Sequence, residues 1–236
     1  MSLERALEDL SAGKFVLLYD SEGRENEIDM IIAAEFVGPS EIATMRREAG
    51  GLICVALHPT ISKNFGLPYL AEVYNVASSK FDILTAVQPN DIPYDERSAF
   101  SLAVNHRRTF TGIIDVDRAL TIQELGRVGR QAFNGTALDE FGKNFRSPGH
   151  VPLLRAADEL LNERRGHTEL SVVLAELAGV TPVVAVCEML DTRTNRALSK
   201  EAAKEYAKGR GLILLDGLDV VAGFQRKEKN ETSRDS

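Results

Sequence analysis

The chain has 236 residues, of which 44% are hydrophobic and 27% are charged, as in an ordinary globular protein. This composition excludes an intrinsically disordered chain, and the 18 glycines follow no collagen period. The net charge of −7, without a basic stripe, predicts solubility and excludes extended nucleic-acid binding. No apolar run approaches the roughly 18 residues that a membrane helix needs, so we expect no membrane partner.

Short apolar runs alternate with helical patterns in the first half of the chain. A helix is expected at the N-terminus because Leu3, Ala6 and Leu10 share one helical face. Prolines break up the segment 59–98, where we expect only short pieces. The other elements expected in this half are strands over 15–19, 30–34, 52–57 and 100–104 and a helix that begins at Pro39.

The second half shows clearer helix signals. Thr121 and Glu124 have capping-box spacing, which predicts a helix start near Thr121. Five glycines between 126 and 149 indicate a long connection, and Thr168 is expected to cap a helix that ends near Gly179. The other expected elements are a helix-like segment over 156–163, strands over 183–190 and 212–215, a helix over 199–208 and an apolar turn over 220–224.

Strands alternate with helices throughout, and no repeat or linker divides the chain. We therefore predict a single domain over 1–224, of either the α/β or the α+β class. Residues 225–236 contain no apolar side chain, so we expect a disordered polar tail. Cys54 and Cys187 lie in apolar runs, so we expect both thiols to be buried. The two cysteines, together with the lack of a signal-peptide pattern, favour a reducing, cytoplasmic setting.

The polar segment 20–29 contains the first candidate site. It carries five carboxylates: Asp20, Glu22, Glu25, Glu27 and Asp29. Such a run can be an ordinary solvated connection. It also lies between two expected strands, where catalytic loops often lie, and Mg²⁺ and Mn²⁺ prefer oxygen ligands. The segment is therefore a candidate metal site.

A second candidate lies at the start of the expected helix, where Arg164 precedes Gly166, His167 and Thr168. Free backbone N–H groups at a helix start bind phosphate, and an arginine can add a two-pronged contact. The positive helix end disfavours a cation, so a metal at His167 would need carboxylates from elsewhere, which the acidic segment can supply. A capped helix preceded by basic residues is the alternative.

Two further residues are candidates for proton transfer. His150 follows Pro148-Gly149, a turn that either leaves it on the surface or projects it into a cavity. Glu188 ends an apolar strand, where a carboxylate is costly unless it is paired or lies at the strand mouth.

Together these features resemble the 3,4-dihydroxy-2-butanone 4-phosphate synthase family of riboflavin biosynthesis. With Ile28 in place of a glycine and Gly23 in place of an acidic residue, the chain is similar to the archaeal-type branch, and because no second domain follows, we expect the monofunctional form. The matching stretches lie between about residues 15 and 190: Arg24-Glu25-Asn26-Glu27, Gly51-Leu52-Ile53-Cys54, Ser98-Ala99-Phe100-Ser101, Thr111-Gly112, Asp117-Arg118, Pro148-Gly149-His150, Arg164-x-Gly166-His167-Thr168 and Cys187-Glu188.

The resemblance implies an α+β fold with a mixed β-sheet and flanking helices, as a single catalytic domain. It also implies a homodimeric lyase whose active site lies near the subunit interface and holds Mg²⁺ or Mn²⁺, with two ions per site. It implies D-ribulose 5-phosphate as the substrate, and L-3,4-dihydroxy-2-butanone 4-phosphate and formate as the products. The implied course is enediol formation, loss of water, a shift of the carbon skeleton and release of C4 as formate.

The resemblance also implies a role for each matching residue. Glu25 and His167 would bind metal, while His150, Glu188 and Cys54 would be catalytic, the first two by moving protons. Arg24 and Asp29 would contact the sugar, and Arg164 and Thr168 the phosphate. The full set of implied substrate contacts is Arg24, Glu25, Asp29, Thr111, Arg164, Thr168 and Glu188.

Two other functions fit the same features. A metal-dependent sugar-phosphate isomerase or aldolase would use the same phosphate and metal contacts but would release no formate. A non-catalytic sugar-phosphate sensor would keep its ligand affinity after loss of His150 and Glu188.

Overall fold

The computed structural model describes residues 2–89, 91–93, 95, 97–132, 135 and 137–233. Within these residues the core is a mixed seven-stranded sheet in the order β4-β5-β3-β6-β2-β1-β9, and β7 and β8 form a separate hairpin. The strands are β1 (Val16–Tyr19), β2 (Ile28–Ala33), β3 (Cys54–Leu57), β4 (Phe100–His106), β5 (Phe145–Arg155), β6 (Val183–Glu188), β7 (Leu190–Asp191), β8 (Arg196–Ala197) and β9 (Ile213–Asp216).

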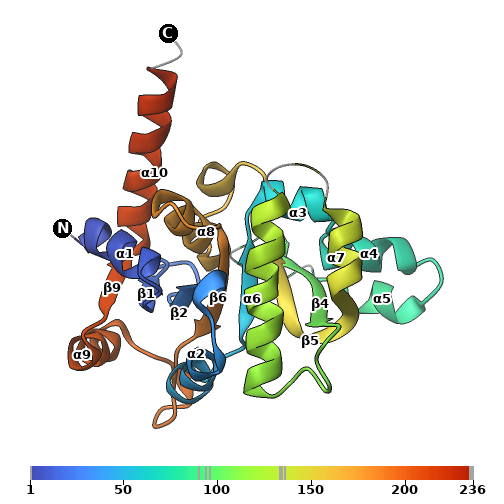
Figure 1. The fold of residues 1–236 in the computed structure, drawn as a ribbon, viewed down its shortest axis with the longest axis horizontal. Helices are drawn as coiled ribbons and strands as arrows, with labels where there is room; N and C mark the ends of the chain where they lie inside the picture. The colour runs from blue at the N-terminus through green and yellow to red at the C-terminus, as the bar shows by residue number, and fades with distance from the viewer. Residues whose placement is uncertain are drawn as a thin grey trace.

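Helices cover both faces of this sheet, as Figure 1 shows. One face packs against α1, α8 and α10, and the other against α2, α3, α6, α7 and α9. The helices are α1 (Ser2–Ser11), α2 (Pro39–Thr44), α3 (Pro59–Phe65), α4 (Leu70–Ala77), α5 (Asp82–Ala86), α6 (Asp115–Ala132), α7 (Leu138–Asn144), α8 (His167–Leu177), α9 (Lys200–Arg210) and α10 (Gly217–Thr232), with short turns of other helix types at Ala34–Phe36, Met45–Ala49 and Leu160–Asn162.

Because both faces are covered, β2 and β6 are buried along nearly their whole length and, apart from Asp29 and Glu188, carry only apolar side chains rather than an alternating pattern. Three candidate residues lie at the same end of these strands. Asp29 on β2 is paired directly with Glu188 on β6, and Cys54 on β3 is paired with Val186 two residues earlier on β6. The predicted α+β fold with a mixed sheet and flanking helices is confirmed, and the sheet supplies the floor of the site.

Helix α6 corrects two predictions. It begins at Asp115 rather than near Thr121, whose hydroxyl lies inside the helix and accepts a hydrogen bond from the backbone N–H of His106 at 3.0 Å. The expected connection over 126–149 is instead occupied by the end of α6, by α7 and by the start of β5. Burial of Leu125 and Val128 against the core outweighs the low helix propensity of the glycines.

The C-terminal segment also differs from the prediction. Residues 225–232 continue α10, which extends away from the body of the molecule (Figure 1), instead of forming a disordered tail. Polar contacts hold this second half of the helix: Lys227 Nζ lies 2.9 Å from Glu176, and Asn162 donates to Glu228 at 3.0 Å. Residues 234–236 lie outside the described part of the chain. No helix in that part combines the length and apolarity needed to cross a membrane.

Candidate active site

The acidic segment folds around Asp20, which follows β1 and is buried. Its carboxylate accepts the backbone N–H of Glu25 at 3.0 Å and that of Glu27 at 3.1 Å. These bonds turn the loop back on itself and hold Glu25 over the end of the sheet. The sequence presented Asp20 only as one member of an acidic run, because its hydrogen bonds depend on the loop conformation.

Glu25 meets His167 although the two residues are 142 positions apart in the sequence. Glu25 Oε2 lies 3.3 Å from His167 Nδ1, and Asp29 Oδ1 lies 3.8 Å from His167 Nε2. Ligand atoms of Asp20, Glu25 and His167 all lie within 4.8 Å of one another. The loop after β1, the start of β2 and the start of α8 therefore converge on one point.

This cluster fits a divalent cation. Among the described residues, Asp29 Oδ1 and His167 Nε2 are buried polar atoms without a hydrogen-bond partner. Buried polar atoms normally have one. These two atoms lie 3.8 Å apart, which is too far for a hydrogen bond, so both have the capacity to bind a cation. Carboxylate oxygens with one imidazole nitrogen suit Mg²⁺ or Mn²⁺ better than a soft metal.

The same charges set the protonation of the cluster. Burial alone would lower the pKa of His167, but the carboxylates of Asp29, Glu25 and Asp20 outweigh it and raise that pKa to about 9. Burial raises the pKa of Asp29 to about 7, although His167 opposes the shift. At neutral pH the ion-free site therefore keeps a proton on His167 and part of one on Asp29.

Glu188 and Cys54 complete the sheet end of the site. Glu188 Oε2 accepts the backbone N–H of Leu52 at 2.8 Å, which fixes the carboxylate beside Asp29. Cys54 is buried, and burial, with the nearby carboxylates of Glu188 and Asp29, raises the pKa of its thiol. Cys54 is therefore a neutral thiol at neutral pH and not a thiolate nucleophile.

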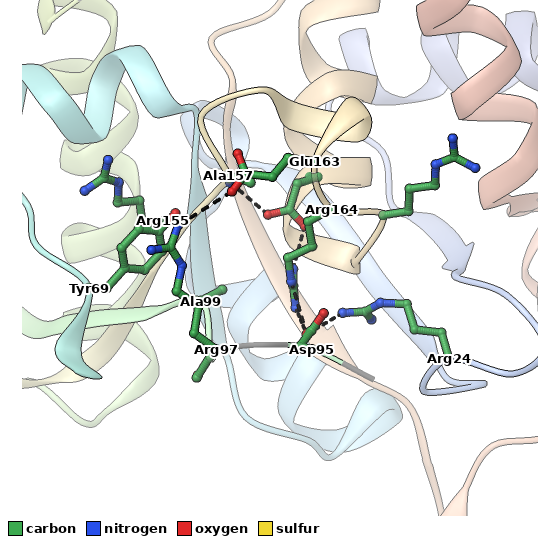
Figure 2. Close-up of a pocket in the computed structure, with 12 residues that line it drawn as sticks. Arg24, Tyr69, Asp95, Arg97, Ala99, Arg155, Ala157, Glu163 and Arg164 are labelled. Carbon is green, nitrogen blue, oxygen red and sulfur yellow. Dashed lines mark hydrogen bonds and ion pairs between the residues drawn. The ribbon is translucent and has the colours of Figure 1, made fainter. Parts of the chain in front are cut away.

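On the other side of Arg24 the site becomes basic. One oxygen of Asp95 accepts from Arg24 Nη2 at 2.7 Å and from Arg164 Nη2 and Nε at 2.7 and 3.1 Å (Figure 2). Arg164 Nη1 is held at 2.5 Å by the buried carboxylate of Glu169. Gly166 permits this arrangement, because a Cβ there would lie 2.3 Å from Arg164 Nη1 and 2.7 Å from Arg24 Nη2.

The start of α8 corrects the prediction for Thr168. The helix begins at His167 with Gly166 as the N-cap, so Thr168 is its buried second residue and not the cap. Glu169 takes the capping role: its carboxylate accepts the N–H of Gly166 at 3.3 Å and that of Ala157 at 3.0 Å. The first N–H groups of α8 lack partners within the helix and, with Arg24 and Arg164, form an anion site.

Two adjoining cavities contain these groups. One of about 570 Å³ is lined by acidic residues, including Glu25, Asp29 and Glu188. The other, of about 600 Å³, is lined by five arginines: Arg24, Arg97, Arg155, Arg164 and Arg165. They share Arg24, Asp95 and Arg164 at their boundary. The combined site therefore suits a small molecule with oxygen atoms for a cation at one end and an anionic group at the other.

The structure brings most of the predicted residues to this site but not all. His150 lies on β5 and is exposed, with its Nδ1 at 3.1 Å from Asn105, and Thr111 is exposed in the loop after β4. Neither lines the two cavities. Those that do are Arg24, Glu25, Asp29, Cys54, Arg164, His167, Thr168 and Glu188. Asp95 was missed because no motif marks it within the proline-broken segment 59–98.

Comparison with known proteins gives one consistent result. The family model described as 3,4-dihydroxy-2-butanone 4-phosphate synthase matches residues 4–222. Enzymes of that name from Archaeoglobus fulgidus and Methanosarcina mazei are 51% and 49% identical, covering 99% and 94% of this chain and 98% and 91% of the relatives. A crystal structure of such a synthase in complex with two magnesium ions is 31% identical, with a TM-score of 0.77 over 97% of this chain and 98% of the other.

The protonation of the cluster predicts that binding of Mn²⁺ releases protons and strengthens as the pH rises. His167 must lose its proton to ligate, and its raised pKa places that loss above neutral pH. We expect release of at least about one proton per site at pH 7, measured by calorimetry in buffers of different ionisation enthalpy. His167→Gln should abolish most of the release, while Glu22→Gln in the same loop should not. A pH-independent affinity between pH 6 and 9 would contradict the assignment.

Proposed function

The chain belongs to the 3,4-dihydroxy-2-butanone 4-phosphate synthase family, and we propose that it converts D-ribulose 5-phosphate into L-3,4-dihydroxy-2-butanone 4-phosphate and formate in riboflavin biosynthesis. The observation that carries the proposal is the two-ended cavity, with a carboxylate–imidazole cluster at one end and paired arginines at the other. The two products together contain the same atoms as the substrate. The reaction therefore needs no oxidant, reductant or nucleotide.

The acidic end would hold Mg²⁺ or Mn²⁺, with two ions per site. Glu25 and His167 would be the ligands, and Asp20 lies within ligand distance of both. Bound ions would stabilise negative charge on the sugar oxygens as the enediol forms. The neighbour solved with two magnesium ions supports this choice of metal.

The basic end would hold the substrate phosphate. Asp95 places one carboxylate oxygen where three N–H groups of Arg24 and Arg164 converge, which is the contact pattern of a phosphate oxygen. Thr168, at the start of α8, lines the acidic cavity beside Arg24 and Arg164, where the N–H groups of the first helical turn would add further donors for the phosphate. We propose that the phosphate displaces Asp95, and that fixing this end positions the sugar carbons near Asp29 and Glu188.

The remaining roles concern the sugar and its protons. Arg24 and Asp29 would contact the sugar hydroxyls, and Glu188 would move protons because it faces the same end of the cavity as Asp29. Cys54 would line the reacting end as a neutral thiol that excludes water.

His150 and Thr111 would reach the reaction from a second copy of the chain. Leu154 of β5 lines the acidic cavity, and His150 lies four positions before it on the same strand. At about 3.3 Å per residue, their backbones are roughly 13 Å apart, which is farther than an imidazole side chain can reach. Beside Thr111, the side chains of Phe110 and Ile114 are 93% and 54% exposed. Such apolar exposure is typical of a partner surface. We therefore propose a homodimer in which this surface meets the partner's cavity.

We propose that the enzyme acts in the cytoplasm. Cys54 and Cys187 are free thiols, as a reducing compartment maintains them. Recovery of the activity in a membrane or secreted fraction would contradict this location.

The proposed reaction is tested by incubating the protein with D-ribulose 5-phosphate and Mg²⁺. Formate and a four-carbon ketose phosphate should form in equal amounts. An isomerase or aldolase would consume substrate without formate, and a sensor would bind it without turnover. Either result would overturn the proposal.

The phosphate contacts predict opposite effects for two variants. Arg164→Ala should weaken binding of ribulose 5-phosphate by about ten- to a hundredfold, because a charged hydrogen bond is worth about 1.5–3 kcal/mol, and should barely affect ribulose. Asp95→Asn should strengthen binding of inorganic phosphate, because the neutral amide competes less for the arginines. Arg193→Ala, which removes an exposed arginine that lines neither cavity, is the control. Equal losses for both sugars on Arg164→Ala would place the phosphate elsewhere.

The dimer predicts complementation between inactive variants. His150→Ala and Glu25→Gln homodimers should each lose turnover. After subunit exchange, a mixed dimer has one site with both defects and one site with neither. Half of the dimers are mixed and half of their sites are intact, so activity should return to up to about a quarter of wild type. The measurement is the formate assay, with exchange followed by mass spectrometry. Exchange without activity would place His150 in its own chain's site.

A further inference from the structure

Asn105 holds the ring of His150 through a small hydrogen-bond network. Asn105 is a buried residue of β4. Its Oδ1 accepts the backbone N–H of His150 at 2.8 Å, and its Nδ2 donates to the carbonyl of Thr111 at 3.3 Å. The same Nδ2 lies 3.1 Å from His150 Nδ1. One amide thus joins both residues that lie outside the cavity.

The first two bonds fix which way the amide points. A backbone N–H can only donate, and a backbone carbonyl can only accept. Turning the Asn105 amide over would set Nδ2 against the N–H of His150 and Oδ1 against the carbonyl of Thr111. Both contacts would then be repulsive, so the atom that faces the His150 ring is the amide nitrogen.

An N–H donor facing Nδ1 decides the tautomer of the neutral ring. Nδ1 must present its lone pair, so the ring proton lies on Nε2. We propose that Asn105 is a positioning residue that holds His150 in this tautomer, so that neutral His150 meets the substrate as a hydrogen-bond donor and not as a base. This inference rests on the proposed function, because it defines how His150 acts in that site.

The local backbone makes the arrangement rigid. The pairing of β4 with β5 jumps from Val104 opposite Val151 to Asn105 opposite Arg146, so residues 147–150 of β5 form a bulged, irregular segment that includes His150. Bulges re-aim side chains at functional sites. Gly112, with φ of +89°, packs so closely that a Cβ there would lie 2.1 Å from Asn105 Nδ2. Only glycine therefore fits beside the amide, and the hydrogen bonds to His150 and Thr111 hold the amide in one orientation.

A donor at this place suits the proposed chemistry. Enediol formation puts negative charge on a sugar oxygen, and a preorganised neutral N–H stabilises such charge as it develops. Removal of protons from carbon would then fall to a carboxylate such as Glu188, which faces the cavity. His150 and Glu188 would thus have different tasks, one as donor and one as proton acceptor.

The tautomer is measured directly by nitrogen NMR of the histidine rings in the intact wild-type enzyme. The chain has four histidines, so the His150 signals can be assigned by their loss in His150→Gln. At a pH where the ring is neutral, Nε2 should carry the proton and Nδ1 should not. A proton on Nδ1 would overturn the proposal. This result does not depend on turnover, so it separates failure of the tautomer from failure of the proposed function.

Kinetics of matched variants test the role. Asn105→Asp replaces the donor with an acceptor and should move the ring proton to Nδ1, lowering kcat by about 10²–10³-fold with little change in KM. Asn64→Asp is the control, because Asn64 Nδ2 also donates to a carbonyl, that of Ala132, away from His150. Unchanged kcat with the proton moved to Nδ1 would overturn the donor role.

A final pair of variants separates donor from base. Glutamine places an amide N–H near the position of Nε2 but cannot act as a base. His150→Gln should therefore keep at least about tenfold more activity than His150→Ala, in line with the worth of a preorganised donor. Equal activity of the two variants would show that His150 works as a base.

Discussion

Negative charge gathered around the buried His167 is the constraint on which the rest of the site depends. Charge in a poorly hydrated place is costly unless it is hydrogen-bonded or paired. Asp20 is satisfied by the backbone of its own loop, and Glu25 by His167 and by Arg24 Nη1 at 3.0 Å. Asp29 Oδ1 has only the ion pair with His167 Nε2 at 3.8 Å and no hydrogen bond, and burial raises the pKa of this carboxyl. The protein leaves a deficit of positive charge that a divalent cation would fill.

Arg24 links this acidic cluster to the anion site. One of its terminal nitrogens contacts Glu25, while the other contacts Asp95 at 2.7 Å. The position of the cation end relative to the anion end is thus set by one guanidinium, which is held in turn against Gly166 at the start of α8. A rigid spacing of this kind selects a substrate of matching length and turns binding at the phosphate into positioning at the sugar.

Local patterns in the sequence predicted the central strands and several residues of the candidate site. Apolar runs indicated the central strands, and chemistry-bearing motifs pointed to Glu25, Arg164 and His167 before any geometry was known. Asp95 was not predictable, because its contacts with Arg24 and Arg164 span 71 and 69 positions and no pattern accompanies them. The start of α6 and the helical tail were mispredicted for a related reason: packing and ion pairs from distant segments outweighed local propensity.

In the proposed dimer, the position of Asn105 would allow a donor from the second subunit to be placed accurately. A flexible loop would have to order the ring at each turnover and lose conformational entropy each time. Here the ring stands on a strand, and an amide from the neighbouring strand fixes its orientation within the subunit that carries it. The exposed Phe110 belongs to the same loop as Thr111, whose carbonyl completes that network. In the proposed dimer, the contact that buries this apolar surface would also deliver the donor, so that assembly and catalytic competence depend on the same few side chains.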